Sequence, residues 1–470
     1  MSENNKTQEK LIKGFATYTI GNFGSKILSF LIVPLYTYYI STTDMGVYDI
    51  LMASINLISP IMTLQISEAA YRWMIRSENN EDRNIYIRST FQVLIFNSIL
   101  ASAIIFLVNY FITIPYCGYF VATLILSRTF QTTTKLLRGL KNQKLFAFSG
   151  ILYTIIFLSS NILQICVFKR NVIALFSSAI IANISVLIFI FFREKEIRCS
   201  ILKKPDKNSI KMMIGYSAPL VPNSLNWWVI NSSDKFIVKH FLGLSSTGIL
   251  GVSHRIPGIL QAVLELFTIS WQDVSVGDKE TSKDFNSELF KSYYIFSFTL
   301  LWFLIPSTKA IVNFIMSDSY KASSDYIAFY YLGTVFQSFS SFYGVGYLRS
   351  RNTKSAFITS VYAAIINAVI NLCFVKFIGM QASAVSTFIA FFVMWLVRER
   401  QNRKELKIDI NWVLFLLLTS ITVVIALASI FFNVNINAIS GIFTLVIFVV
   451  FNKKTLLKIS FKVKSMIIRK

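Results

Sequence analysis

Apolar stretches of roughly twenty residues recur along the whole chain, separated by short polar breaks such as "STTD", "RGLKNQK" and "SRNTK". An α-helix of about this length crosses the hydrocarbon core of a bilayer. Of the 470 residues, 54% are hydrophobic. The sequence therefore predicts an all-α polytopic membrane protein. We predict fourteen membrane-spanning helices, over residues 15–40, 45–66, 86–110, 116–137, 145–168, 172–192, 212–239, 247–270, 290–312, 325–348, 355–377, 380–397, 411–432 and 437–452.

The distribution of basic residues predicts the orientation of these helices. Most of the 46 lysines and arginines fall between spans on the side that also holds both termini. The opposite side holds only Lys169, Arg170, Lys239, Lys321 and Lys376. Because basic loops stay on the cytoplasmic side, we expect both termini to be cytoplasmic. The formal charge of +23 is then explained by basic loops that lie against an anionic lipid leaflet, and it does not indicate a nucleic acid partner.

An internal repeat predicts how the helices are grouped. The stretch "TFQTTTKLLRGLKNQK" (129–144) resembles "VFQSFSSFYGVGYLRSRNTK" (335–354), and a matching asparagine follows each copy, Asn161 and Asn371. Repeats with an even number of spans are related by a pseudo-twofold axis along the membrane normal. We predict two six-helix lobes with a central cavity, followed by two additional helices and a basic tail. The predicted boundaries are 1–192 and 212–400 for the lobes, 193–211 for a cytoplasmic loop between them, and 401–470 for the appendix.

Polar side chains at helical spacing indicate which helices line the cavity. Such residues share a face or lie beside it in four spans: Asn22 and Lys26 in the first, Arg128 and Lys135 in the fourth, Asn223, Asn226, Trp227, Asp234 and Lys235 in the seventh, and Arg255 and Glu265 in the eighth. Polar faces inside a membrane turn toward one another or toward water. Glycines and prolines also interrupt the first and seventh spans, which is typical of helices around a transport site.

The sign of these charges predicts an anionic substrate. The cations outweigh the acids, so the cavity attracts negative charge. Guanidinium groups suit phosphate, and amides and aromatic rings suit sugars. The candidate substrate-binding residues are Lys26, Arg128, Arg255, Lys135, Lys235, Asn22, Asn223, Asn226 and Trp227. The candidate carriers of a coupling proton or sodium ion are Asp49, Asp234 and Glu265.

Structural roles remain open for the same residues. Lys135 and Lys235 could extend to the membrane surface, and Asp49 could lie at the interface. Glu265 could hold Arg255 or His254 from a turn or more away. Buried ion pairs are the alternative for Lys26, Arg128 and Arg255. Asn161 and Asn371 could join neighbouring helices through hydrogen bonds.

Several enzymatic classes find no support in the sequence. It contains no GxxxxGK[ST] phosphate loop and no HExxH motif, and its four cysteines are far apart. We therefore predict no catalytic residue, no metal and no cofactor beyond a possible coupling ion. A membrane glycosyltransferase or polymerase would carry a long outer loop, whereas the predicted outer loops are short.

Two stretches carry a resemblance to a known family. "YSAPLVPNSLNWWVINSSDKFIVKHFLGLSSTGILGVSHRI" (216–256) and "FLIVPLYTYYISTTDMGVYDI" (30–50) are similar to segments of the Wzx-type repeat-unit flippases of bacterial polysaccharide synthesis. These belong to the multidrug, oligosaccharidyl-lipid and polysaccharide exporter (MOP) superfamily. "SHRIP" (253–257) departs from the commoner small residue followed by lysine.

This resemblance implies fourteen helices in two lobes and transport by alternating access. The implied substrate is an undecaprenyl-pyrophosphate-linked oligosaccharide, moved outward across the bacterial inner membrane for O-antigen or another surface polysaccharide. The implied partners are membrane lipids, a polysaccharide polymerase and a chain-length regulator. The alternatives are a flippase of lipid-linked peptidoglycan precursors and a drug antiporter, although a basic cavity would repel cationic drugs.

Overall fold

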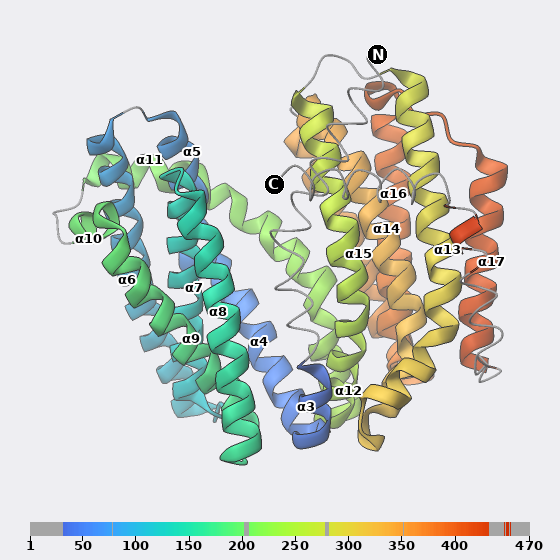
Figure 1. Ribbon diagram of the computed structural model, residues 1–470, viewed down its shortest axis with the longest axis horizontal. Coiled ribbons are helices and arrows are strands. Elements are labelled where there is room, and N and C mark those ends of the chain that lie inside the picture. Colours follow the sequence, from blue (N-terminus) through green and yellow to red (C-terminus); the bar gives the residue numbers. More distant parts are fainter. Residues whose placement is uncertain are drawn as a thin grey trace, which may run out of the picture. The chain divides into compact units, whose positions relative to one another are not determined.

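The computed structural model describes residues 32–77, 79–201, 206–277, 282–350, 352–431, 446, 448–450 and 452. Within these ranges the chain is helical throughout and has no strand (Figure 1). Its main elements are α3 (Val33–Tyr39), α4 (Thr42–Thr63), α5 (Ile66–Arg76), α6 (Asn80–Phe111), α7 (Cys117–Gly139), α8 (Gln143–Ile162), η2 (Leu163–Val167), α9 (Val172–Arg193), α10 (Lys195–Ile201), α11 (Lys207–Ser217), η3 (Ala218–Leu220), α12 (Val221–Gly277), α13 (Lys283–Ile315), η4 (Asp318–Ser323), α14 (Ser324–Arg349), α15 (Thr353–Ile378), α16 (Gln381–Leu406) and α17 (Trp412–Phe431).

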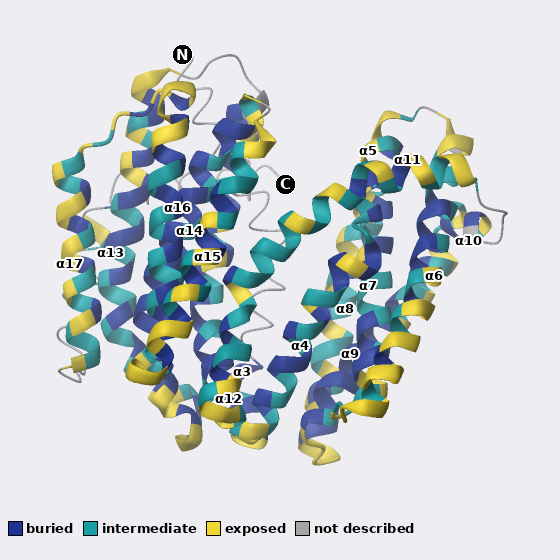
Figure 2. Cartoon of the chain, turned by 180° about the vertical axis from the view of Figure 1, so that it is seen from behind, coloured by how far each residue is buried: buried dark blue, intermediate teal, exposed yellow. Residues whose placement is uncertain are grey.

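Helices cover twelve of the predicted spans, those from the second to the thirteenth. Nine helical segments in the described ranges are long and apolar enough to cross a membrane. Much of their apolar surface faces outward, for example Phe96, Ile99 and Leu107 along α6 (Figure 2), as expected of helices surrounded by lipid. The chain is therefore a multi-pass membrane protein. Most of the first and last predicted spans lies outside the described residues.

Several helices extend past the predicted ends of their spans. The helix α13 begins at Lys283, and α16 continues to Leu406 through "RERQNRKEL". Charged residues with long side chains propagate a helix well even where hydropathy falls. Hydropathy therefore located the apolar part of each helix and missed its polar ends.

The connection after the second predicted span is a helix rather than a loop. Its residues form α5, which buries Ile66, Ala69, Ala70 and Met74 and leaves its basic residues exposed or half-buried. These buried positions recur every three or four residues, the spacing of one helical face. The predicted loop 193–211 likewise contains α10 and the first turn of α11.

The chain divides into two compact units. The first unit contains residues 39–235, and the second contains residues 1–38 and 236–470. The helix α12 runs through the boundary between them and is interrupted at Gly243, whose φ of 87° lies outside the helical region. Glycine reaches this conformation without a steric penalty, and Gly243 falls between the predicted spans 212–239 and 247–270. The predicted lobe boundaries at 192 and 212 remain a prediction.

The second unit is built around α14. This helix buries residues on all sides, and its aromatic rings pack with those of neighbouring helices, as Phe336 and Phe339 do with Trp395. A buried arginine, Arg398 of α16, joins three helices. Its guanidinium group donates to Ser340 O of α14 at 3.1 Å and to Thr359 Oγ1 of α15 at 3.1 Å. The predicted span 380–397 ends just before Arg398, whereas the helix α16 continues past this residue to Leu406.

The two copies of the sequence repeat share local geometry. Asn142 begins α8 and Asn352 begins α15, with φ/ψ of −86°/68° and −89°/69°. Each asparagine accepts a hydrogen bond through Oδ1 from the backbone three residues on, at 3.1 and 3.0 Å. The asparagines that follow, Asn161 and Asn371, are both fully buried. Equivalent helix starts and equivalent buried amides support the repeat inferred from sequence.

Candidate functional site: a polar cavity in the first unit

A polar cavity of about 270 Å³ lies within the first unit, where α4, α5, α7 and the start of α12 meet. Nearly all of its lining residues carry polar side chains. They are Asn56, Ser59, Pro60, Thr63, Gln65, Ser67, Glu68, Arg128, Gln131, Thr132, Lys135 and Ser224. A polar cavity between membrane-spanning helices is a candidate site for a polar substrate or for ions.

An interruption of the helix forms one wall of this cavity. Between α4 and α5, Leu64 and Gln65 adopt left-handed conformations with φ of 47° and 53°. Such values are strained for residues other than glycine, and strain of this kind clusters at functional sites. The turn is held by neighbours: Gln65 Nε2 donates to Ser224 Oγ at 2.9 Å, and Asn97 Nδ2 donates to Met62 O at 2.8 Å.

Arg128 is the main cation of the cavity. It lies on α7, donates through Nη1 to Gln131 Oε1 at 2.9 Å, and donates through Nη2 to Asn56 Oδ1 at 3.2 Å. Both acceptors are neutral amides, so these bonds leave the charge of the guanidinium uncompensated. Its buried Nε has no hydrogen-bond acceptor in the described part of the chain. The side chain is therefore oriented by the protein and keeps capacity for an anion.

Lys135 lies further along the same face of α7 and forms an ion pair with Glu68 of α5. This pair holds Lys135 inside the bundle, so the alternative in which it extends to the membrane surface is not what the structure shows. Arg128 and Lys135 against Glu68 leave the lining with one net positive charge. Arg128, Gln131 and Lys135 all line the cavity from α7.

A second ion pair lies elsewhere in the first unit. Lys235 Nζ of α12 is 3.7 Å from Asp49 Oδ1 of α4, and the Asp49 side chain is only 8% exposed. The preceding residue, Asp234, is also buried and accepts a hydrogen bond from the backbone N–H of Lys235 at 2.9 Å. The structure therefore brings together Asp49 and Lys235, two candidate residues from different predicted spans.

The predicted aromatic and amide residues of α12 are half-buried. Asn223, Asn226 and Trp227 fall in the helix of the first unit, and the Nδ2 of Asn226 has no acceptor among the described residues. None of the three lines the polar cavity, whose only α12 residue is Ser224. The adjacent Trp228 has a structural contact, because its Nε1 donates to Ala53 O of α4 at 2.8 Å.

Two of the described candidate site residues, Arg255 and Glu265, belong to the second unit. The Arg255 guanidinium carbon is 5.3 Å from the centre of the Tyr36 ring, within the range of a cation–π contact. Glu265 is exposed and makes no ion pair within the described ranges, so the expected Glu265–Arg255 pair is absent there. The prediction that Lys26, Arg128 and Arg255 share one cavity stays a prediction, since Lys26 and Asn22 lie outside the described residues.

Several residues of the cavity are not among the candidates predicted from the sequence. They include Glu68, which pairs with Lys135, and the amides of Gln65 and Asn56. A signal was present, because Asn56 and Pro60 interrupt an otherwise apolar span, and proline frees a carbonyl oxygen one turn earlier.

The fold of this chain is similar to that of known membrane transporters. Solved structures of the MOP superfamily match nearly the whole chain, which shows that the fold is theirs. The lipid II flippase MurJ in an inward closed conformation matches with a TM-score of 0.67 at 15% identity, covering 94% of this chain and 99% of MurJ. An inward-facing multidrug resistance MATE transporter matches with a TM-score of 0.62 at 13% identity, covering 86% and 95%. A MOP superfamily transporter from Pyrococcus furiosus, described as having reversed polarity in its binding pocket, has a TM-score of 0.58 at 10% identity, with 86% and 97% covered.

The family follows from the sequence. The family described as "Polysaccharide biosynthesis protein" matches residues 11–272, which is more than half of the chain. The chain therefore belongs to this polysaccharide biosynthesis family. No curated protein gave a significant match.

Proposed function

We propose that this protein is a flippase for undecaprenyl-pyrophosphate-linked oligosaccharide repeat units. It would move them from the cytoplasmic to the outer leaflet of a bacterial inner membrane, by alternating access, for the synthesis of O-antigen or another surface polysaccharide. The polysaccharide biosynthesis family and the fold shared with a lipid II flippase support this proposal.

The observation that carries the proposal is the polar cavity with its excess positive charge. Arg128 is held by two neutral amides and can bind a phosphate oxygen without first breaking an ion pair. The amides and hydroxyls beside it are suited to hydrogen-bond sugar hydroxyl groups. A cationic drug would meet repulsion at the same place, so the cavity favours an anionic head group over the substrates of a drug antiporter.

The polysaccharide displayed by living cells tests this role. In a strain that lacks its own repeat-unit flippase, the unmodified chain should restore surface polysaccharide. Arg128→Gln should reduce that amount roughly tenfold or more, because a charge-assisted hydrogen bond contributes about 1.5–3 kcal/mol. Arg76→Gln is the matched control, since Arg76 is exposed on α5 and lies outside the cavity.

Each alternative has its own outcome in the same strains. Restoration of growth in cells depleted of the lipid II flippase, without restored surface polysaccharide, would point to a peptidoglycan-precursor substrate. Resistance to cationic dyes would point to drug export. Wild-type polysaccharide levels from Arg128→Gln at equal protein abundance would remove Arg128 from the mechanism.

We further propose that a proton or sodium gradient drives transport, with Asp49 and Asp234 as the carriers. Both carboxyl groups are buried beside Lys235, where binding of a cation would compete with the Lys235–Asp49 pair. In vesicles, transport should stop when the gradient of the coupling ion, proton or sodium, is collapsed, and it should be insensitive to collapse of the other gradient. In Asp49→Asn, the rate of transport should no longer depend on the gradient of the coupling ion. Transport that continues without either gradient would exclude this coupling.

A further inference from the structure

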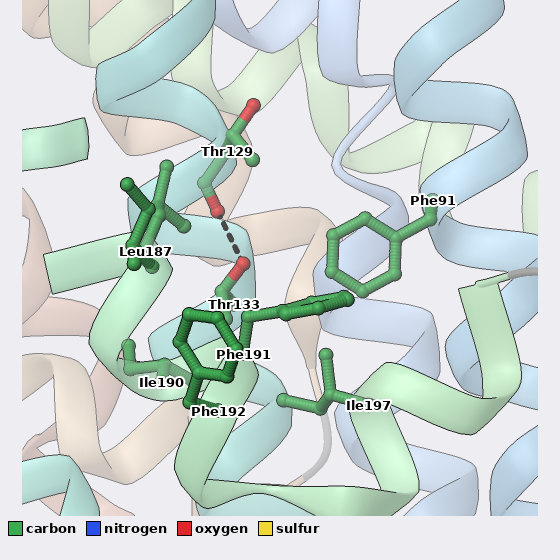
Figure 3. A pocket seen from close by; sticks show the side chains of 9 residues that line it. Phe91, Thr129, Thr133, Leu187, Ile190, Phe191, Phe192 and Ile197 are labelled. Carbon is green, nitrogen blue, oxygen red and sulfur yellow. Dashed lines mark hydrogen bonds between the residues drawn. The ribbon is translucent and has the colours of Figure 1, made fainter. Parts of the chain in front are cut away.

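An apolar groove of about 510 Å³ lies on the first unit (Figure 3). Its α7 residues, Thr129 and Thr133, differ from those that line the polar cavity. It is formed by α6, α7, α9 and α10. Phe91 of α6 and Phe191 of α9 point toward one another across it, and Ile197 of α10 lies at one end. Leu187, Ile188 and Phe192 complete the side formed by α9.

Among the described residues, the lining of the groove offers no free polar group to a ligand. The polar side chains in this lining are those of Thr129 and Thr133 of α7. Thr133 Oγ1 donates to Thr129 O at 2.7 Å, and Thr129 Oγ1 donates to Ile125 O at 2.8 Å. Both hydroxyls are thus bound to their own helix. A sugar or a phosphate inside the groove would lose hydration without compensation, so the occupant must be a hydrocarbon chain.

One side of the groove opens toward the bilayer. Ile188 is 51% exposed and Phe192 is 67% exposed, whereas Phe91 and Ile197 at the base are buried. Exposed apolar side chains on a membrane-spanning helix face lipid. A lipid chain can therefore enter from the side, without passing through the bundle.

Two arginines lie directly beside the lining residues. Arg193 follows Phe192, is exposed, and ends α9. Arg198 follows Ile197 on α10, and its Nη1 lies 3.4 Å from Phe192 O. Both are at the end of the unit that the basic residues predict to be cytoplasmic. Cations at this position can hold the phosphate of a lipid whose chain lies in the groove.

Two acids lie among these cations. Glu194 Oε2 accepts a hydrogen bond from Asn142 Nδ2 at 2.9 Å, and Glu196 is half-buried. Lys195 adds a third cation, so residues 193–198 carry one net positive charge at this end of the groove.

We propose that the groove binds one anionic phospholipid, with an acyl chain between α6, α9 and α10 and its phosphate on Arg193 and Arg198. The apolar groove matches the acyl chain of such a lipid, and the two arginines at its end match the negative charge of the head group. The site is separate from the polar cavity, and the proposal does not depend on which substrate is transported.

Photo-crosslinking tests this site directly. The purified chain is reconstituted with phospholipid probes that carry a diazirine at the end of one acyl chain, and labelled peptides are identified by mass spectrometry. A phosphatidylglycerol probe should label the segments around Phe91 and Leu187–Phe192, and a phosphatidylcholine probe with the same chains should label them several-fold less. Unlabelled phosphatidylglycerol should compete on the unmodified chain.

Variants separate the groove from the surrounding surface. Ile188→Trp should fill the groove and remove the labelling. Ile184→Trp is the control, because Ile184 lies one turn earlier on α9, is exposed and does not line the groove. Arg193→Gln and Arg198→Gln should each weaken labelling by the anionic probe about fivefold.

Three results would overturn the proposal. Equal labelling by the two head groups would exclude selection for a head group with net negative charge. Unchanged labelling in Ile188→Trp would place the probe elsewhere. Stronger labelling by a polyprenyl-phosphate probe than by phosphatidylglycerol would assign the groove to the carrier lipid of the substrate instead.

Discussion

Lys135 and Glu68 form an ion pair on two helices that begin far apart in the sequence. The pair lies in the wall of the polar cavity, and the Glu68 side chain is 40% exposed. Exposure to solvent screens the attraction, so its contribution to folding is modest. Its greater effect is on the cavity, where removing one partner changes the net charge by one unit.

A double-mutant cycle should measure this pair. Glu68→Gln and Lys135→Gln should each lower the free energy of unfolding of the purified protein. The double variant should lose less free energy of unfolding than the sum of the two single losses. The expected coupling free energy is about 1 kcal/mol. Strict additivity of the two substitutions would contradict a direct interaction.

Arg398 should be much more sensitive to substitution. Its guanidinium group is buried and donates to α14 and α15 through several hydrogen bonds, including one to Ser360 Oγ at 3.2 Å. Arg398→Met should lower the free energy of unfolding by about 3 kcal/mol or more, because carbonyl and hydroxyl acceptors lose a charged donor. The exposed neighbour Arg400→Met is the control, and equal stability of the two variants would contradict the structure.

At the scale of single elements, helix ends supply a clean test of backbone strain. Lys141 follows the C-cap of α7 in a left-handed conformation with φ of 61°, and Asn142 N donates to Leu137 O at 3.0 Å, as in a Schellman turn. Lys141→Gly should raise the free energy of unfolding by about 1 kcal/mol. Lys144→Gly, within α8, should lower it by a similar amount, and melting temperatures of the two variants check both signs.

The contact between α14 and α16 gives a second test at this scale. A Cβ atom at Gly346 would lie 2.4 Å from Asn402 Oδ1, closer than real atoms approach. Gly346→Ala should therefore destabilise the second unit by about 1–3 kcal/mol. Adding Asn402→Ala should restore part of that loss, and a double variant no more stable than Gly346→Ala would contradict the proposed clash.

Sequence patterns predicted the helices well and their contacts poorly. Hydrophobic length located twelve spans because the requirement to cross a bilayer is local to each segment. The partner of Lys135 could not be predicted in the same way, since Glu68 is distant in the sequence and several acids were equally plausible. Asp49 and Lys235 were each identified as unusual, but only the fold shows that they form a pair.

For the whole molecule, the internal repeat can be recognised from the sequence because the matching residues have the same structural role in both copies. Asn142 and Asn352 each begin a helix with the same backbone geometry, and such a requirement restricts the residue type. The predicted grouping of Lys26, Arg128 and Arg255 had no comparable local signal. A polar face indicates that a helix borders water or another helix, but it does not identify the neighbouring helix.

The proposed orientation can be tested with cysteines. Cys199 lies exposed on α10, and Lys169 lies exposed beyond η2 at the other end of α9. In a background with serine at the other native cysteines, a membrane-impermeant thiol reagent should label Cys199 only in permeabilised cells. A chain with Lys169→Cys as its single cysteine should be labelled in intact spheroplasts. The opposite pattern would invert the predicted topology.

The helix α7 separates two chemically different compartments. Arg128 and Lys135 face the polar cavity, while Thr129 and Thr133, on an adjacent face of the same turns, line the apolar groove. Rotation of α7 about its axis that brings Arg128 and Lys135 to the positions of Thr129 and Thr133 would put both charges against hydrocarbon. Such a rotation costs free energy, whereas a tilt or shift of α7 together with its neighbours keeps each face in its own environment.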